Sequence, residues 1–480
     1  MWNFVDRKMK KRTLTIVTVL TIAFYVAVLV GWHLYVPHSD LKESLPGADN
    51  RPAGLARKAD EVKVGEFFMK YDAAAPEGMN GVWSEFRGAE RNNIVKATET
   101  IQTTSDYPEL WSFDTGEGHA APVVYQGRVY VLDYDETLLS DMLRCFSLQT
   151  GEELWRRWYR VPLKRNHGFS RTIPAVANGR IVSIGPSGHV MCCDATTGDL
   201  KWTKDLQKEY DMEVPFWYTG QCPHIDGDEV VLVPAGKDTL MMGCDLETGK
   251  VKWATPNTIG LKMSHSSVMP MEIAGIRTFV YVGVGGVCGI SAETSNRGKL
   301  LWHTSKWQPS VVAPSPLRLS SNRIFLVAGY GNGGALLQVN GSGSQLTATI
   351  LDAYKSDKGL SSEQQTPILY NDMIISILPK DGGGNRSKLV CYSPNDLHKP
   401  LWTSAQDERF GLGPYLVITD KLFALSEDGE LFVYQLGKGN MKLIKRQSIM
   451  EGVDAWGPLA YADGRLIVRD AHRVKCLKID

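Results

Sequence analysis

The chain has 480 residues, of which 43% are apolar and 22% charged, and its 53 Lys and Arg balance its 53 Asp and Glu. This balance gives no global charge that would indicate a nucleic-acid partner or an acidic surface. The eight cysteines form no CxxC pair and no Cys/His cluster with zinc spacing. The composition therefore predicts a globular protein with a large apolar core, no nucleic-acid partner and no metal site.

The N-terminus predicts one membrane-spanning helix. Residues 13–36 read TLTIVTVLTIAFYVAVLVGWHLYV and contain no Asp, Glu, Lys or Arg. As a helix, this segment would extend about 36 Å, which is enough for a hydrocarbon core of about 30 Å. Residues 1–12 are rich in Lys and Arg, so the positive-inside rule places this tail in the cytoplasm. The remainder of the chain is then expected in the periplasm or outside a bacterial cell, attached to the cytoplasmic membrane.

The competing interpretation of this helix is a cleaved signal peptide. The stretch that follows the apolar core, VGWHLYVPHSD, contains no A-x-A cleavage pattern and no lipid-anchoring Cys. The sequence therefore favours an uncleaved anchor. Residues 37–82 are polar and contain Pro and Ala, which predicts a tether with a short helix near residues 62–71.

A proline recurs eight times from about residue 109 onward, each time beside a short apolar run. A turn and a second apolar run follow, as in AAPVVYQGRVYVLD, which is the pattern of a β-hairpin whose first strand begins at proline. Successive prolines are 44 to 52 residues apart, and this even spacing indicates a repeat architecture. The eight are Pro122, Pro174, Pro223, Pro270, Pro316, Pro367, Pro414 and Pro458.

A second repeated signature is Thr-Gly with a tryptophan four residues after the glycine. It occurs in SLQTGEELW (147–155), DATTGDLKW (194–202) and DLETGKVKW (245–253), with weaker copies at 292–302 and 393–402. We expect the Thr-Gly pair to form a turn and the tryptophan to lie on a fourth strand, with its indole packed against the neighbouring repeat unit, or blade. The expected blade-docking residues are Trp111, Trp155, Trp202, Trp253, Trp302 and Trp402.

Four strands in each of eight units, without a helical pattern, predict an all-β, eight-bladed β-propeller over residues 83–480. A stack of β-sandwiches would need linkers between units, and the sequence has none. The last unit, residues 456–480, supplies only three strands, whereas PELWSFDTG carries Trp111 near the start. We expect this N-terminal strand to complete the last blade and to leave no open sheet edge.

These features resemble the PQQ-like repeat family. The Thr-Gly-to-Trp signature, the period and the eight copies all match, and WSEFRGAERNNI (83–94) is similar to a WxxFRG stretch that precedes such propellers in bacterial proteins. The resemblance covers roughly residues 83–480 and implies the fold more specifically than the function. Family members include quinoprotein alcohol dehydrogenases and the barrel-assembly lipoprotein BamB, whose lipid-anchoring Cys is missing here.

Three motifs are candidates for a redox, nucleotide or calcium site. Cys192-Cys193 resembles an adjacent-cysteine disulfide of quinoprotein dehydrogenases, but its place in the repeat favours small core-filling side chains. GYGNGG (329–334) matches GxGxxG, yet a strand follows it rather than a helix, which favours a hairpin turn. DYDETLLSD (133–141) lacks the Gly and terminal Glu of a calcium loop, which favours a solvated hairpin.

The connections that enter the proline-started strands are expected to lie on one face, around the central funnel. They contain aromatic, Arg and His side chains, which are typical of binding surfaces, although such residues also plug channels or pack between blades. The candidate face comprises Arg165, His167, Phe169, Arg171, Trp217, Tyr218, His265, Trp307, Arg409, Phe410, Asp454 and Trp456.

Three functions follow as hypotheses. The first is a non-catalytic, membrane-anchored scaffold that presents its loops to an envelope protein or peptide and needs no cofactor. The second is a membrane-bound oxidoreductase, for which the resemblance implies pyrroloquinoline quinone (PQQ) and calcium in the funnel. It requires a carboxylate, an Asn and an Arg to converge beside an aromatic platform. The third is a sensor that binds a small ligand or polysaccharide.

Overall fold

The computed structural model describes residues 2–35, 61–343 and 345–480, which form two compact units, residues 1–61 and 62–480. The first unit contains helix α1 (Trp2–Leu34), whose stretch Thr13–Leu34 has a mean hydropathy of 2.4 and is exposed. The predicted N-terminal apolar helix is therefore confirmed, with the length and composition of a membrane span or a signal sequence. Residues 36–60, which include the end of the expected span and most of the expected tether, lie outside the described residues.

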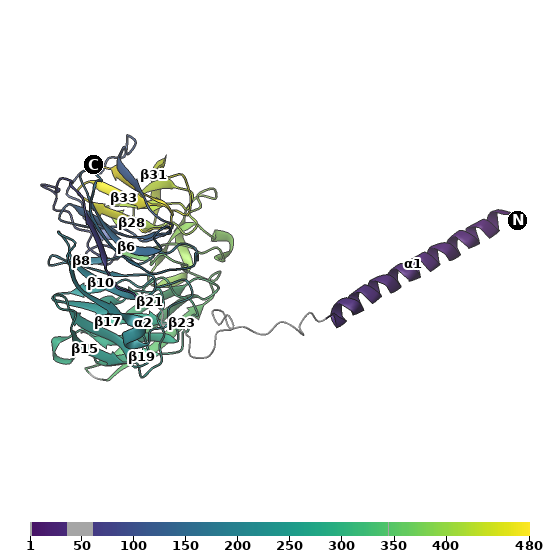
Figure 1. Ribbon diagram of the computed structural model, residues 1–480, viewed down its shortest axis with the longest axis horizontal. Helices are drawn as coiled ribbons and strands as arrows, with labels where there is room; N and C mark the ends of the chain where they lie inside the picture. Colours follow the sequence, from purple (N-terminus) through teal and green to yellow (C-terminus); the bar gives the residue numbers. More distant parts are fainter. Residues whose placement is uncertain (1, 36–60, 344) are drawn as a thin grey trace. The chain divides into compact units, whose positions relative to one another are not determined.

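The second unit consists of eight sheets, each with four antiparallel strands, which confirms the predicted eight-bladed propeller (Figure 1). The blades follow one another in chain order. In blades 1 to 7, four consecutive strands run from the channel outward, whereas blade 8 has three consecutive strands and takes its outer strand from near the start of the repeats. Blades 1 and 2 contain β4 (Val123–Tyr125), β5 (Arg128–Asp135), β6 (Ser140–Ser147), β7 (Glu153–Arg160), and β8 (Ala175–Ala177), β9 (Arg180–Ile184), β10 (His189–Asp194), β11 (Leu200–Asp205). Blades 3 and 4 contain β12 (His224–Asp226), β13 (Glu229–Leu232), β14 (Thr239–Asp245), β15 (Val251–Pro256), and β16 (Met269–Ile273), β17 (Ile276–Gly283), β18 (Gly286–Ser291), β19 (Leu300–Thr304).

Blades 5 to 8 repeat this order. Blades 5 and 6 contain β20 (Leu317–Arg318), β21 (Arg323–Ala328), β22 (Gly333–Ser342), β23 (Gln345–Tyr354), and β24 (Ile368–Tyr370), β25 (Met373–Ile377), β26 (Leu389–Ser393), β27 (Asp396–Thr403). Blades 7 and 8 contain β28 (Tyr415–Ile418), β29 (Lys421–Leu425), β30 (Glu430–Leu436), β31 (Met441–Ser448), and β32 (Ala460–Ala462), β33 (Arg465–Arg469), β34 (Arg473–Lys478). Helix α2 (Leu206–Tyr210) and the 3-10 turns η1 (Thr294–Asn296) and η2 (Gly383–Asn385) are short additions between strands.

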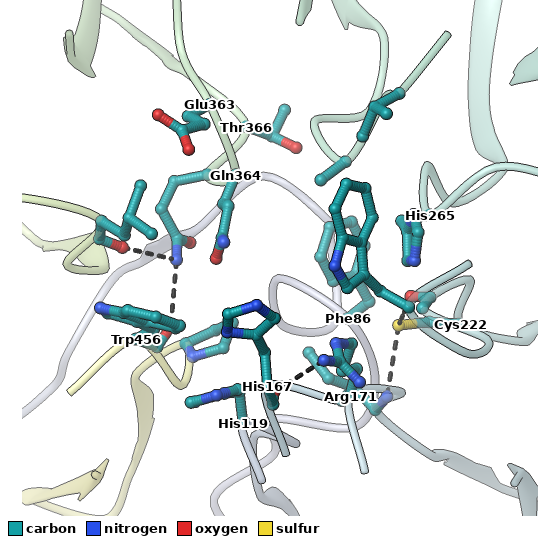
Figure 2. A pocket seen from close by; sticks show the side chains of 18 of the residues that line it. Phe86, His119, His167, Arg171, Cys222, His265, Glu363, Gln364, Thr366 and Trp456 are labelled. Atoms are coloured by element: carbon teal, nitrogen blue, oxygen red, sulfur yellow. Dashed lines mark hydrogen bonds between the residues drawn. The ribbon is translucent and has the colours of Figure 1, made fainter. Parts of the chain in front are cut away.

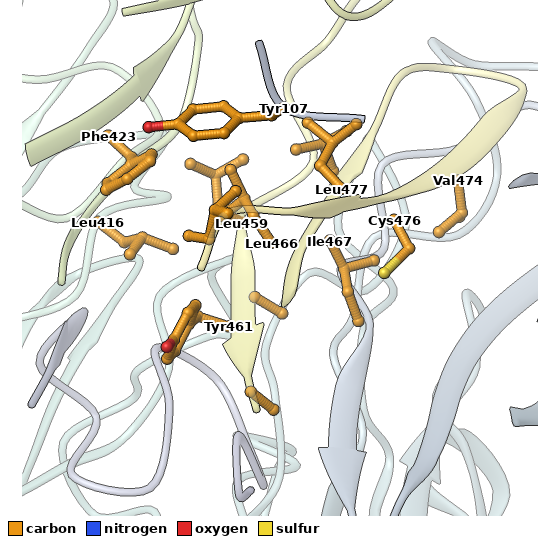
Figure 3. Packing of buried hydrophobic residues seen from close by; sticks show 14 of the residues in the cluster. Tyr107, Leu416, Phe423, Leu459, Tyr461, Leu466, Ile467, Val474, Cys476 and Leu477 are labelled. Atoms are coloured by element: carbon orange, nitrogen blue, oxygen red, sulfur yellow. The ribbon is translucent and has the colours of Figure 1, made fainter. Parts of the chain in front are cut away.

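The ring closes at the predicted strand. β3 (Glu109–Asp114) pairs antiparallel with β34, which places Trp111 opposite Cys476 and completes blade 8. Inner strands β32 and β4 then lie in contact, so blade 8 adjoins blade 1. The packing between blades 7 and 8 is a continuous apolar cluster, in which Leu416 and Phe423 of blade 7 lie beside Leu459 and Leu466 of blade 8 (Figure 3).

Turns with a central glycine contact the tryptophans of neighbouring blades; three are Thr-Gly turns, and in the fourth Arg297 precedes the glycine. The indole of Trp111 lies over Gly151 of blade 1 and donates a hydrogen bond of 2.9 Å to the Leu148 carbonyl. A Cβ on Gly151 would lie 2.6 Å from Trp111, and its φ of 74° also favours glycine. Trp155, Trp202 and Trp253 lie in the same way over Gly198, Gly249 and Gly298. Each of these turns thus requires glycine for two reasons: the left-handed backbone conformation and the close approach of the indole.

The segment before the repeats differs from the expected helix and tether. Residues 67–70 form strand β1 (Phe67–Lys70) on the outer edge of blade 1, where Phe67 stacks on Trp158 at 5.6 Å. The expected short helix near 62–71 is therefore wrong, because β7 offers an open sheet edge and an aromatic partner to an aromatic segment. The compact unit begins at Val62, so residues 62–82 belong to the propeller unit.

Residues 83–95, here called the plug, cross the central channel. Trp83 pairs with Val124 of blade 1, and β2 (Ile94–Val95) at the other end pairs in parallel with β28 of blade 7. Between these ends, Arg87 donates to the Pro367 carbonyl beside blade 6, and Arg91 donates to the Val268 carbonyl beside blade 4. The plug thereby joins inner strands from separate sides of the ring and closes the channel.

The acidic motif at 133–141 is a hairpin between β5 and β6, as expected, but it is not fully solvated. Asp133 and Asp141 are buried, Asp133 in an ion pair of 2.9 Å with Arg144 and Asp141 as the acceptor of a 2.8 Å hydrogen bond from Tyr159. The expectation of a solvated hairpin was wrong because the sequence did not reveal these two partners.

Asp141 supplies a prediction about pH. Burial raises the pKa of Asp141 from 3.8 to about 7, so the folded state binds an extra proton between these values and loses stability as pH rises through the window. We expect Asp141→Asn, which stays uncharged, to be more stable than the wild type above pH 7 by roughly 2–4 kcal/mol. This advantage should vanish toward pH 4. Urea unfolding at acidic and alkaline pH measures the effect, and identical pH profiles for the two proteins would contradict it.

Candidate functional site

A cavity of about 370 Å³ lies at one mouth of the central channel. Every one of the eight connections that enter an inner strand contributes to its lining, so the cavity is the product of the ring as a whole. Figure 2 shows side chains from separate connections arranged around this common space. In chain order, the connections contribute His119; His167, Arg171 and Ile173; Trp217, Gly220 and Cys222; His265; Val311 and Ala313; Glu363, Gln364, Gln365 and Thr366; Leu412; and Trp456 and Pro458.

The plug supplies further lining residues, Phe86, Arg87 and Asn93. Arg87 has a left-handed backbone, with φ of 67°, and its guanidinium is buried. Asn93 donates a hydrogen bond of 3.0 Å to the Tyr415 carbonyl, which fixes this end of the plug to blade 7. The plug, which precedes the repeats in the chain, therefore forms the floor of the cavity.

Five residues of the predicted face line this cavity: His167, Arg171, Trp217, His265 and Trp456. Their common origin in the connections to proline-started strands is the reason that the repeat pattern located them. That this face binds a partner remains a prediction.

Four of the other predicted residues lie in loops and do not line the cavity. Arg165 forms an ion pair of 2.5 Å with Glu117, and the Tyr218 hydroxyl donates to the Lys164 carbonyl. Asp454 is exposed and has a left-handed backbone. Arg409 also lies outside the lining, where its guanidinium donates to the Arg386 carbonyl.

Three predicted residues are core residues instead. Trp307 packs with the apolar cluster between blades 4 and 5, and Phe410 is buried among residues of blades 6 and 7. Phe169 stacks on Tyr134 at 4.3 Å, beneath the loops. These three agree with the alternative that such residues pack between blades, because an aromatic side chain in a connection also fills the gap between neighbouring blades.

Several lining residues were missed. His119, Glu363 and Gln364 lie in connections equivalent to the one that contains His265, so the same rule applied to blades 1 and 6 could have found them. Tyr330 lies in GYGNGG, which the structure confirms as the turn between β21 and β22. Lys380 follows β25 and carries no signal in the repeat. The plug residues carried only a family resemblance, with nothing to show that they enter the channel.

Aromatic side chains form opposite parts of the cavity wall. Trp217 stacks on Tyr330 at 5.7 Å with an interplanar angle of 18°, although Trp217 lies in the connection to blade 3 and Tyr330 in the turn between β21 and β22 of blade 5. Trp456 lies against the His119 ring at 4.7 Å. Flat apolar surfaces of this kind contact ligand rings and aliphatic groups without a large loss of side-chain entropy.

The charges of the lining are set by burial. Burial lowers the pKa of His119 to about 3 and that of His265 to about 4, with nearby Arg171 adding to both effects, so both rings are neutral at pH 7. Burial also lowers the pKa of Arg87 and of Arg171 to about 10, which leaves both charged at that pH. Glu363, the one carboxylate among the described lining residues, has its pKa raised by burial.

This lining fits the calcium and PQQ of the second hypothesis only in part. A carboxylate, an Asn, an Arg and aromatic walls do lie around one cavity, but Glu363 is the single carboxylate of the described lining. Calcium takes six to eight oxygen ligands, commonly several carboxylates. Besides Glu363, the described part of the cavity offers the amides of Asn93, Gln364 and Gln365 and the Thr366 hydroxyl, and no group of three His, Cys, Asp or Glu side chains suited to a metal occurs among the residues described. No reaction step through these groups is therefore derived for this chain.

The adjacent cysteines also lie away from the cavity. Cys192 and Cys193 are neighbours in β10 and point to opposite faces of blade 2. Cys192 packs with residues of blade 3, and Cys193 packs with residues of blade 1. Both thiols are free and buried, in agreement with core-filling side chains.

This arrangement predicts unreactive cysteines. Burial raises the pKa of Cys193 to about 12 and that of Cys192 still further, so neither forms the nucleophilic thiolate near neutral pH. We expect iodoacetamide to leave both unlabelled in the folded protein and to label both after denaturation without reductant. Peptide mass spectrometry measures this, and a Cys192–Cys193 disulfide in the denatured, unreduced sample would contradict it.

Comparisons with solved structures place the fold among known propellers. BamB from Moraxella catarrhalis aligns with a TM-score of 0.50 at 12% identity, over 78% of this chain and 98% of that one. The quinohemoprotein alcohol dehydrogenase ADHIIG from Pseudomonas putida HK5 aligns with a TM-score of 0.57 at 12% identity, over 83% and 80% of the two chains. At these identities the likeness concerns the fold.

Sequence comparison supports the same relationship. A quinohemoprotein alcohol dehydrogenase of Comamonas testosteroni is 27% identical over 182 residues, which is 35% of this chain, and the chain spans about a quarter (24%) of the length of that relative. A family described as outer membrane protein assembly factor BamB matches residues 139–396, more than half of the chain. The chain therefore belongs to this family of PQQ-like β-propellers.

Proposed function

We propose that this protein is a membrane-anchored, extracytoplasmic binding module whose site is the cavity at the channel mouth, where it engages an envelope protein or ligand. The observation that carries the proposal is the convergence of all eight connections on one cavity with aromatic walls and a closed floor. Family propellers named for outer membrane protein assembly support a role in protein interaction.

The test is recovery of envelope partners on the tagged, full-length chain after mild cross-linking of cells. Trp217→Ala and Arg171→Gln, which alter the cavity lining, are expected to reduce the recovered partner at least tenfold. Arg409→Ala is the matched control, because this arginine lies in a connection but outside the cavity. Equal recovery with all three variants would contradict a site in the cavity.

The location is part of the same proposal. Helix α1 would anchor the protein in the cytoplasmic membrane, with the propeller outside the cytoplasm. Protease added to spheroplasts should then digest the propeller of the intact chain, while a chain cleaved after the helix would be released into the soluble fraction. Protection of the propeller from protease would place it in the cytoplasm and contradict the proposal.

The oxidoreductase alternative has a direct test. The relationship to quinohemoprotein alcohol dehydrogenases favours it, whereas the single carboxylate of the described cavity lining opposes calcium binding there. Incubation of the purified full-length chain with PQQ and calcium should leave no quinone absorbance after desalting. A retained stoichiometric quinone band would overturn the non-catalytic assignment.

A further inference from the structure

The charge of Arg87, at the floor of the cavity, has no carboxylate partner. Its Nη2 donates to the carbonyls of Pro367, at 2.9 Å, and Asn92, at 3.2 Å, while Nε and Nη1 have no hydrogen-bond partner among the described residues. The side chain is 3% exposed. A buried guanidinium without an opposite charge is unfavourable by several kcal/mol, so its presence calls for a compensating group.

Arg171, on the wall of the same cavity, is a second cation without an ion-pair partner among the described residues. Its guanidinium donates to the carbonyls of Asn166, His167 and Gly168, at 2.7, 2.7 and 3.3 Å, and forms no ion pair with a described carboxylate. These backbone carbonyls orient the guanidinium but do not neutralise its positive charge. Figure 2 shows Arg171 beside His167, turned toward the space that the other labelled side chains surround.

The rest of the lining leaves the positive charge of these two arginines in excess. Lys380 is a third cation, against Glu363 as the one carboxylate of the described lining. The indole nitrogen of Trp456, which can only donate, is buried without a described partner. The cavity thus holds more cationic than anionic side chains, between apolar aromatic walls, Trp217 and Tyr330 among them.

We propose that the ligand group taken by this cavity is an organic anion, a carboxylate carried on an aromatic or aliphatic body. Arg171 contacts the carboxylate, the charge of Arg87 beneath the floor attracts it, and the aromatic walls contact the body. The inference rests on the proposed function of the cavity as the binding site. The carboxylate belongs either to a small organic acid or to the C-terminal end of a peptide.

Matched acid and amide probes test this proposal on the full-length chain in detergent. Naphthalene-2-carboxylate is compared with naphthalene-2-carboxamide, and N-acetyl-Leu-Phe as free acid with its C-terminal amide, by calorimetric titration. We expect each acid to bind at least tenfold more tightly than its amide, and tighter binding with less added salt. The acid that binds more tightly identifies the source of the carboxylate, and either result supports the inference.

Variants show whether the preference arises in the cavity. Arg171→Gln and Arg87→Met are expected to reduce the acid-to-amide ratio to within about twofold, while Arg160→Gln, at an exposed arginine at the end of β7, should leave it unchanged. If Arg87→Met does not fold, Arg171→Gln alone decides the outcome.

The outcomes separate this inference from the proposed function. Equal affinity of acids and amides, or no binding of any probe, would overturn the anionic ligand. The binding function would still stand if partner recovery depended on Trp217. Loss of that dependence would overturn the proposed function itself.

Discussion

Trp111→Ala is expected to destabilise the propeller by about 3–5 kcal/mol, because it removes a buried indole from the strand that closes the ring. Trp111 is 7% exposed and lies over Gly151, and its indole N–H is bonded to the Leu148 carbonyl. Since β3 is the outermost strand of blade 8, both closure and docking on blade 1 depend on this side chain. Chemical unfolding of the full-length chain measures the change.

Phe216→Ala is the matched control for this experiment, because that aromatic side chain is 79% exposed and its removal should change stability little. Hydrogen exchange should also accelerate in β34, the pairing partner of β3. Similar stability of the Trp111 and Phe216 variants would show that the ring does not depend on its closing strand.

Arg91→Met is expected to destabilise the plug by about 3–5 kcal/mol, because it leaves the Glu85 carboxylate buried without its cation. The two side chains form an ion pair of 2.6 Å, 3% and 9% exposed, and Glu85 also contacts His224 of blade 3 at 2.9 Å. Arg91 lowers the pKa of Glu85 against the effect of burial, so this stabilisation is present above pH 4.5 and is lost as pH falls through the folded-state pKa.

A double substitution separates the charge effect from loss of packing. Arg91→Met with Glu85→Gln removes both charges, so it should recover most of the stability that the single change loses. Unfolding by urea at neutral pH compares the three proteins. If the double variant is no more stable than Arg91→Met, the loss arises from packing or from the bond to the Val268 carbonyl.

The sequence was informative wherever one local feature recurs in every blade. Pro122 and its seven counterparts mark the inner strands; Pro270 lies inside β16, and the others directly precede their strands or, for Pro458, stand two residues before. Gly151 and Trp111 likewise belong to patterns that could be compared between units. Repetition therefore predicted the blade number and the closing strand.

Features that occur once were the ones that sequence could not place. The plug reaches inner strands more than 170 residues away, as the bond from Arg91 to Val268 shows, and no local pattern reports such a contact. Trp307 and Trp456 both lie in connections, yet one fills a blade interface and the other lines the cavity. That choice depends on the space between packed blades, which periodicity does not determine.

The central claim is that partners bind at the channel mouth, and site-specific photocross-linking in intact cells tests it most directly. A photoreactive phenylalanine derivative at Tyr330, which is 52% exposed and lines the cavity, is compared with the same group at Leu401, which is 51% exposed on the outer strand β27. We expect a discrete cross-linked product from position 330, lost in the Arg171→Gln background, and none from position 401. Cross-linking from 401 alone, or from 330 regardless of Arg171, would contradict a binding site built by the eight connections.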